Sequence, residues 1–198
     1  MNKTKIFPYD FLKEESGGHF YVRLLPNLTS MEISGDPIVQ ASSWPPNSEV
    51  GSFRRPNNHY YSYAVINNWD DMNRYAKKEV SIIRYGKDIC DFIVEIIEGN
   101  HRNIFDIQSP YCIKMRAKYK EGYLYFEKYY FESNENIIYD PHHPGKSDKD
   151  LITKFLLDRD VSIEQLAIKS SDEPFKTDLK KKYADIIRNE KLRSIGIL

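Results

Sequence analysis

Residues 111–131, YCIKMRAKYKEGYLYFEKYYF, consist of two aromatic-rich runs separated by Glu121-Gly122. Tyrosine, phenylalanine and β-branched residues favour strands, and glycine supplies the positive φ that a tight turn needs. Alternation in the second run would place on one face of a strand Tyr123, Tyr125, Glu127, Tyr129 and Phe131. The stretch therefore predicts a β-hairpin with Tyr111–Lys120 and Tyr123–Phe131 as its arms.

Other short apolar runs between breakers predict the rest of a β-rich body. They are His19–Leu25, His59–Ile66, Asp91–Ile97 and Asn136–Tyr139, and Asn103–Ile107 would extend or pair with the third of them. Between residues 35 and 58, repeated glycine, proline and asparagine exclude a long helix. That stretch is predicted to be ordered but irregular.

Helical spacing of apolar residues appears in two parts of the chain. Trp69–Glu79 predicts one helix inside the body. After Ser147 a first helical pattern begins, Ser162–Gln165 opens a second, and residues 172–193 form a third with Pro174 in its first turn. The order predicts an α+β fold, with a compact β-rich body at residues 1–146 and a helical extension at residues 147–198 packed on it.

The third of these helices carries an apolar stripe that is too wide to leave in water. It contains Phe175, Leu179, Tyr183, Ile186 and Ile187. We expect this stripe to pack on the body or on a second copy of the chain, with Lys180, Lys181 and Arg188 solvated.

Composition excludes several classes of protein. The chain has 198 residues, with 29 lysines and arginines against 29 aspartates and glutamates, so binding of nucleic acid through bulk charge is not expected. It lacks a run of about 18 apolar residues, which argues against a membrane span, and its first residues lack the apolar segment of a secretory signal. Its two cysteines fit a reducing compartment. We therefore expect a cytoplasmic protein, with export by another route left open.

The metal-binding and nucleophilic residue types do not form a recognisable site. His142 and His143 are adjacent, so on an extended segment they would point to opposite faces. Cys90 and Cys112 lack the spacing of zinc ligands and lie among apolar neighbours, as buried structural thiols do. No metal is expected, and a cysteine nucleophile is the less favoured interpretation.

An arginine pair lies in the proline- and asparagine-rich stretch. Arg54-Arg55 is near Trp44, Phe53, Tyr60 and Tyr61 in sequence. Arginine binds phosphate through its planar fork and aromatic rings stack on bases, so a nucleotide surface is one interpretation. An exposed loop whose arginines keep it soluble is the favoured one.

One ordered series of residues suggests a function. A strand with Arg23 is followed by a strand with Ser62 that runs into the predicted Trp69–Glu79 helix, and a late strand ends in Glu132. This order resembles the ADP-ribosyltransferase-like superfamily over roughly residues 19–140. The resemblance implies a β-rich fold that binds NAD in a cleft, cleaves the nicotinamide glycosidic bond, and modifies a macromolecule or hydrolyses NAD, as a toxin or effector would.

The resemblance also implies roles for individual residues. Glu132 would be catalytic and would stabilise the oxocarbenium-like state, as carboxylates do in glycoside hydrolysis. Arg23 would hold the NAD phosphates, Ser62 would support the site, and Tyr61 would be a further NAD-binding residue. A serine of Ala41-Ser42-Ser43 is an alternative to Ser62, and Glu127 or Glu135 is an alternative to Glu132.

A second hypothesis belongs to a different class. The chain lacks P-loop, GxGxxG, HExxH and GxSxG strings, and it has 15 tyrosines and a long proline- and asparagine-rich stretch. Tyrosine-rich surfaces make good protein contacts because the rings bury area at a small entropic cost. The alternative is therefore a non-catalytic protein-interaction module, immunity-, antitoxin- or effector-like, with a partner protein in place of NAD.

Overall fold

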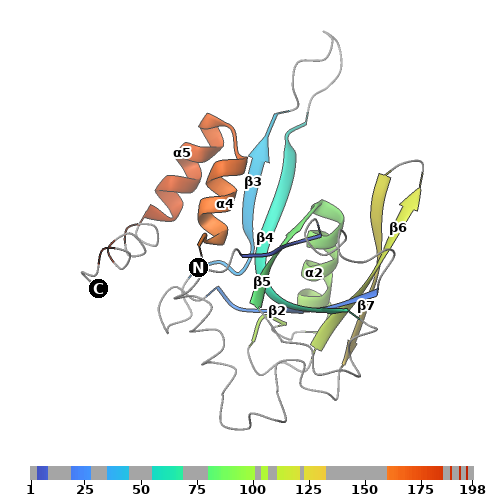
Figure 1. Ribbon diagram of the computed structural model, residues 1–198. Helices are drawn as coiled ribbons and strands as arrows, with labels where there is room; N and C mark the ends of the chain where they lie inside the picture. The colour runs from blue at the N-terminus through green and yellow to red at the C-terminus, as the bar shows by residue number, and fades with distance from the viewer. Residues whose placement is uncertain are drawn as a thin grey trace.

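The computed structural model describes residues 4–8, 19–27, 35–44, 55–68, 80–100, 104–106, 111–120, 123–132 and 160–184, with residues 188, 192 and 195. Within these ranges a mixed sheet of seven strands has helices on both faces (Figure 1). The strands are β1 (Ile6–Phe7), β2 (His19–Leu24), β3 (Val39–Ser43), β4 (Asn57–Asn68), β5 (Val80–Tyr85), β6 (Tyr111–Lys120) and β7 (Tyr123–Glu132). The helices are α2 (Lys87–Asn100), α4 (Ile163–Ser170) and α5 (Glu173–Lys182). The predicted α+β class with C-terminal helices is confirmed.

The sheet is built around β4, its longest strand. The strand order is β1-β5-β4-β2-β6-β7, and β3 also pairs with β4. β3 and β2 follow one another along the same side of β4, because each shares paired positions of β4 with β5 on the opposite side. The pair β1–β5 is parallel, whereas the other pairs in the described ranges are antiparallel.

One face of the sheet is covered by α2. Its Ile89, Ile93 and Ile96 follow one another at intervals of four and three residues, so they form a single apolar stripe, and all three are buried. The stripe packs on a cluster of side chains from β1, β2, β4, β5 and β6, which includes Phe20 and Met115. We call this the α2 face of the sheet.

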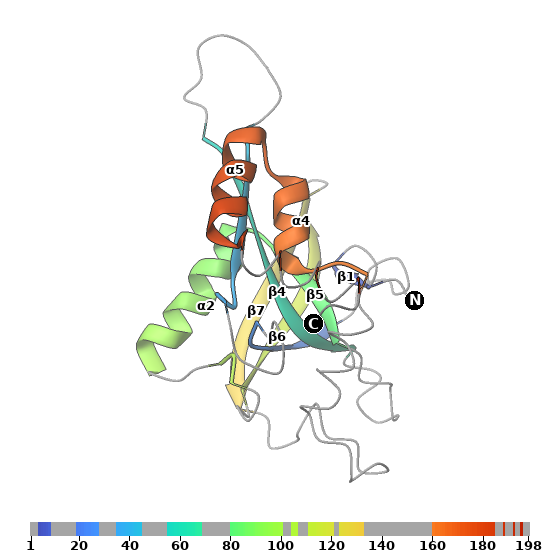
Figure 2. The ribbon, with the colours of Figure 1, turned by 90° about the vertical axis from the view of Figure 1, so that its left-hand side faces the viewer.

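The opposite face is covered by α4 and by the end of α5 (Figure 2). Ile163 and Ala167, one turn apart on α4, are buried on a cluster from β2, β3, β4, β5 and β6. Tyr183, directly after α5, joins the same cluster. We call this the α4 face.

Helix α4 begins with a capping box, whose two residues can be recognised in the sequence. The Ser162 hydroxyl accepts a hydrogen bond from the Gln165 backbone N–H at 3.2 Å, and the Gln165 side chain accepts one from the Ser162 N–H at 3.0 Å. This reciprocal capping box satisfies two backbone donors that would otherwise have no partner at the helix start. The predicted helix at Ser162–Gln165 is confirmed.

The predicted strand at Asp91–Ile97 is wrong, because these residues lie inside α2. A short, continuous apolar run fits a buried strand as well as one side of a buried helix. The wider spacing, which extends back to Ile89, shows the helical period, and Lys87 and Asp91 form an ion pair one turn apart. The predicted extension at residues 103–107 is also wrong where it is described, since Ile104 and Phe105 form a turn.

Three strands, β1, β3 and β5, extend the sheet beyond the prediction. β3 lies within residues 35–58, so the expectation of an irregular stretch is wrong for Val39–Ser43. Its five residues contain only Val39 and Ala41 as apolar side chains, both buried on the α4 face. β5 was not predicted either. β3 and β5 pair with β4, and β1 pairs with β5, so long-range pairing rather than local composition defines all three.

The other strands agree with the sequence prediction. β2, β4 and the β6–β7 hairpin are confirmed, and Lys120 pairs with Tyr123 as a two-residue connection requires. Some predictions lie outside the described residues: the helix at 69–79, the strand at 136–139 and the helix that begins after Ser147. No helix in the described ranges is both long enough and apolar enough to span a membrane.

The C-terminal stripe packs on the body, as predicted, where it is described. Leu179 and Tyr183 contact the cluster of the α4 face, and the Phe175 ring lies 6.4 Å from that of Trp44. Ile186 and Ile187 lie outside the described residues. Lys180, Lys181 and Arg188 are exposed, as expected.

Candidate functional site

Arg23, the residue expected to hold the NAD phosphates, is buried in β2 on the α4 face. It pairs with Val65 of β4, and its neighbours Tyr21 and Leu25 belong to the cluster that α4 covers. Its positive charge lowers the pKa of the Cys112 thiol and so opposes the larger effect of burial. Arg23 is therefore enclosed between the sheet and α4.

Tyr61, the second expected NAD-binding residue, lies on the same face as Arg23. Its ring is buried in the cluster of the α4 face, and its hydroxyl is 2.8 Å from the Ser170 Oγ at the end of α4. The ring and the hydroxyl both attach α4 to the sheet. Stacking of a nicotinamide or adenine ring on Tyr61 would require α4 to move away.

Ser62 is fully buried on the α2 face. Its hydroxyl donates a hydrogen bond to the Pro37 carbonyl at 2.7 Å and lies 2.8 Å from the Tyr85 hydroxyl. Burial raises the pKa of Tyr85, and the hydrogen bond with Ser62 opposes that shift. The hydroxyl of Ser62 thus links β4, β5 and the segment before β3.

The expected site residues are therefore not all brought together. Arg23 and Tyr61 face α4, whereas Ser62 faces the opposite side of the sheet. Since Arg23 is opposite Val65, Ser62 lies three positions along β4 and so has the other orientation. One cleft on one face of this sheet cannot contain both side chains.

The rival serine also has a structural role. The Ser42 hydroxyl donates a hydrogen bond to Asn58 Oδ1 at 2.7 Å, and its backbone N–H donates one to Ser171 Oγ at 3.1 Å. These bonds join β3 to β4 and to the end of α4.

The predicted catalytic glutamate lies at the edge of the sheet. Glu132 is the last residue of β7 and pairs with Tyr111; its side chain is outside the described part of the chain. Of the rivals, Glu127 is half-buried and forms an ion pair with Lys118, while Glu135 is outside the described residues. The role of Glu132 stays a prediction.

The two thiols do not form a nucleophilic site. Cys90 lies on α2, inside the stretch where the predicted strand was wrong, and Cys112 lies in β6. Burial raises the pKa of both thiols, that of Cys112 to about 12, so the reactive thiolate is suppressed. Among the described residues no three His, Cys, Asp or Glu side chains could hold a metal ion. His142, His143 and Arg54 lie outside those residues, and Arg55 is exposed.

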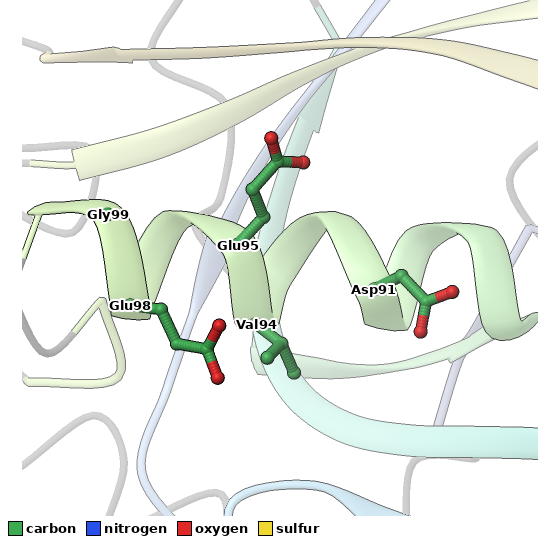
Figure 3. A pocket seen from close by; sticks show the side chains of 5 residues that line it. All are labelled: Asp91, Val94, Glu95, Glu98 and Gly99. Atoms are coloured by element: carbon green, nitrogen blue, oxygen red, sulfur yellow. The ribbon is translucent and has the colours of Figure 1, made fainter.

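A hollow in the described part of the chain lies on the outer side of α2. It has a volume of about 460 Å³ and is lined by Asp91, Val94, Glu95, Glu98 and Gly99. Asp91, Val94 and Glu98 project from one side of the helix, and Glu95 from the other (Figure 3). Val94 is 38% exposed and lies between the carboxylates of Asp91 and Glu98 along the helix. We call this surface the α2 hollow.

The charge of the α2 hollow is negative along its length. Asp91 is paired with Lys87 at 2.6 Å at the beginning of the helix. Glu95 and Glu98 are exposed, and neither has an ion pair within the described ranges. Lys87 offsets the charge of Asp91, so Glu95 and Glu98 carry the negative charge that a cation or a basic side chain would meet.

The sequence analysis missed these residues because it placed them in a strand. The signal that could have found them is the same helical period that buries Ile89, Ile93 and Ile96. On a helix, Asp91, Val94 and Glu98 then share the outer side, which binary patterning leaves to solvent. None of the residues predicted from the resemblance lines the hollow.

Comparison with known proteins adds no family. No protein-family model matches the chain, and no curated protein matches its sequence.

Proposed function

We propose that the chain is a non-catalytic protein-interaction module, immunity-, antitoxin- or effector-like, whose α2 hollow binds a positively charged segment of a partner protein. The observation that supports it most is Val94, an exposed aliphatic side chain within a row of carboxylates. A partner with lysine or arginine beside an apolar side chain would match both chemistries. Such mixed surfaces, with charge around an apolar centre, are typical of protein interfaces.

The position of the hollow also suits a macromolecular partner. It lies on the solvent side of a helix whose other side is anchored by three isoleucines, so the surface is presented on a rigid element. Binding there requires no movement of the core, and most protein interfaces change little in backbone between free and bound states.

The NAD-dependent alternative has less support from the described residues. It needs Arg23, a serine and a glutamate at one cleft, and Arg23 and Ser62 lie on opposite faces of the sheet. Its remaining support is the order of strands and the position of Glu132 in the sequence. Incubation with NAD tests it directly, and we expect no nicotinamide release and no NAD-dependent change in Tm. Release of nicotinamide that is lost in Glu132→Gln would overturn the proposed function.

The proposed function is tested with a defined probe. A fluorescent helical peptide of lysine and leucine would be titrated with the full chain, and its anisotropy followed at low and high salt. The wild-type protein should bind the peptide, and its affinity should fall as salt is added, because exposed charge pairs are screened. Glu98→Lys should weaken binding about tenfold, since it replaces an attraction by a repulsion next to Val94.

The matched control changes the same charge elsewhere. Glu173→Lys alters net charge identically at an exposed position in α5, far along the chain from the hollow. Equal weakening by Glu98→Lys and Glu173→Lys would mean that the peptide follows only the overall charge, and the hollow would then have no specific role. A Val94→Ser variant completes the set, and it should weaken binding without any change in salt dependence.

A further inference from the structure

Three of the described strands, β1, β3 and β7, form outer edges of the sheet. These edges differ in their length and in what covers them. β1 is two residues long and is followed directly by Pro8, which has no backbone N–H to donate. The outer edge of β3 is covered by the α4–α5 connection. Ser42 N–H donates to Ser171 Oγ, the Asp172 N–H donates to the Ser42 carbonyl at 3.2 Å, and Trp44 N–H donates to Asp172. The β1 edge is thus short, and the β3 edge is covered.

The third edge is β7. It is ten residues long, contains neither proline nor glycine, and pairs with β6 over its whole length. No strand or helix within the described ranges pairs with its other side. Because a two-residue connection makes Lys120–Tyr123 a hydrogen-bonded pair, the even-numbered residues of β7 direct their N–H and C=O groups outward. A long edge of this kind is a template for another strand.

We infer that the edge of β7 binds the same edge of a second copy of this chain, so that two sheets join into one across a two-fold axis. Antiparallel pairing of identical strands is self-complementary, as an isologous interface requires. The axis is perpendicular to the sheet, so each register is centred on one residue of β7. The inference does not depend on the proposed function, because β7 contributes no residue to the α2 hollow.

Charge selects the register. Centres on Glu127 or Lys128 would place like charges directly opposite each other, which destabilises a strand pair. A centre on Tyr130 places Lys128 opposite Glu132 of the second copy, and symmetry makes this pair twice. It is the one register that pairs opposite charges within β7. The Lys128 ammonium is already held by Asp88 at 3.2 Å and lies 5.9 Å from the centre of the Phe92 ring, so it is positioned in advance.

The net charge of the chain is also compatible with association of two copies. Its 29 positive and 29 negative side chains give no net charge, so two copies do not repel each other at long range. Polar backbone groups at the edge gain protein partners on pairing. A pairing of residues 128–132 with themselves would add five residues per copy to a continuous sheet.

The inference is tested by sedimentation velocity on the full chain over a wide concentration range. We expect a monomer–dimer equilibrium, with slower amide hydrogen exchange at Lys128, Tyr130 and Glu132 as the dimer forms. Tyr130→Lys places two lysines opposite each other at the axis, so it should raise the dissociation constant at least about tenfold. Tyr125→Lys, the same substitution on the same strand but outside the overlap, should change it by less than about twofold.

A charge exchange keeps the test informative if a lysine at 130 disturbs the fold. Glu132→Lys should weaken the dimer, and adding Lys128→Glu to it should restore the affinity, because the two charges are then exchanged across the axis. A chain that is monomeric at every concentration overturns the inference. So does a dimer that Tyr130→Lys and Glu132→Lys leave unchanged, since its interface would lie elsewhere.

Discussion

The two faces of the sheet are covered by helices in different ways. On the α2 face the helix contacts the sheet through buried isoleucines, and its polar link to the strands, Asp88–Lys128, lies at the exposed rim. On the α4 face apolar contacts are supplemented by hydrogen bonds from the sheet to α4. The Tyr63 hydroxyl accepts from the Ile163 N–H at 3.2 Å, and Tyr61 contacts Ser170 at 2.8 Å.

The difference shows what each kind of contact specifies. Apolar contacts are non-directional, so the α2 stripe fixes which side of the helix is buried more strongly than its exact position. Hydrogen bonds have narrow distance and angle ranges, so the bonds at both ends of α4 fix its position along the strands. The α4 face is therefore the more specified of the two, and it also encloses Arg23 and Tyr61.

The largest loss of stability is expected from a substitution in the buried stripe of α2. Ile93 is 0% exposed at the centre of the stripe, so Ile93→Ala should lower the free energy of unfolding by about 2–5 kcal/mol. Urea denaturation followed by circular dichroism would measure it. Val94→Ala, at the next position on the solvent side, is the control and should change the free energy by less than about 0.5 kcal/mol. Similar losses from both substitutions would contradict the orientation of α2.

A smaller effect is expected from a polar contact on the α4 face. Asn27 Nδ2 donates to Glu164 Oε1 at 2.6 Å and to the Asp36 carbonyl at 3.0 Å, and both Asn27 and Glu164 are buried. Glu164→Ala should lower the free energy of unfolding by about 1–3 kcal/mol, because it removes a charged acceptor from a buried amide.

A double-mutant cycle separates this contact from the helix itself. If the pair is coupled, Glu164→Ala should cost less in an Asn27→Ala background than in the wild type. The control Glu173→Ala removes a carboxylate whose side chain is 81% exposed, in the first turn of α5. Additive losses in the cycle would show that the 2.6 Å contact contributes nothing to stability.

The N-terminal cap of α4 should contribute less to the free energy of unfolding than the Asn27–Glu164 contact does. Ser162→Ala removes one half of the capping box and should lower the free energy of unfolding by about 1 kcal/mol. Thermal unfolding of Ser162→Ala beside Thr177→Ala, which removes an exposed hydroxyl within α5, would compare a cap with a mid-helix position. A larger loss in Thr177→Ala would contradict the role of the cap.

Local signals in the sequence predicted some elements, and long-range pairing decided the others. The hairpin and the capping box depend on neighbours a few residues apart, so Glu121-Gly122 and Ser162–Gln165 were sufficient to locate them. β3 and β5 depend on pairing with β4, and the Asp91–Ile97 run fits both a strand and a helix until the partner layer is known. Such tertiary context overrides local preference.

The same limit applies to the candidate site. Arg23 and Ser62 were both placed correctly in strands, but the face each side chain occupies depends on the register of β2 with β4. That register pairs Arg23 with Val65 and is set by contacts between distant parts of the chain. The α2 hollow was missed for a different reason, since its residues share a side only when the segment is a helix.

The last prediction uses the two thiols to compare the faces by pH. Burial raises the pKa of Cys112, on the α4 face, from 9.0 to about 12, with Arg23 opposing the shift. Above its own pKa the unfolded chain releases this proton, whereas the folded chain retains it. The free energy of unfolding therefore falls as pH rises, by about 1 kcal/mol at about pH 10, and the effect is absent at neutral pH.

Cys112→Ala should remove most of this alkaline slope, whatever it costs in stability at neutral pH, and urea denaturation between about pH 8 and pH 10 would measure it. That range stays at or below the ordinary pKa of the tyrosines, so Tyr85, whose pKa burial also raises, contributes little. Cys90→Ala is the matched control. Cys90 is half-buried on α2, its pKa is raised mainly by that burial, and water reaches part of its surface, so its slope should change less. A larger change in Cys90→Ala than in Cys112→Ala would mean that the α2 face excludes water better than the α4 face, and the comparison of the two faces would be reversed.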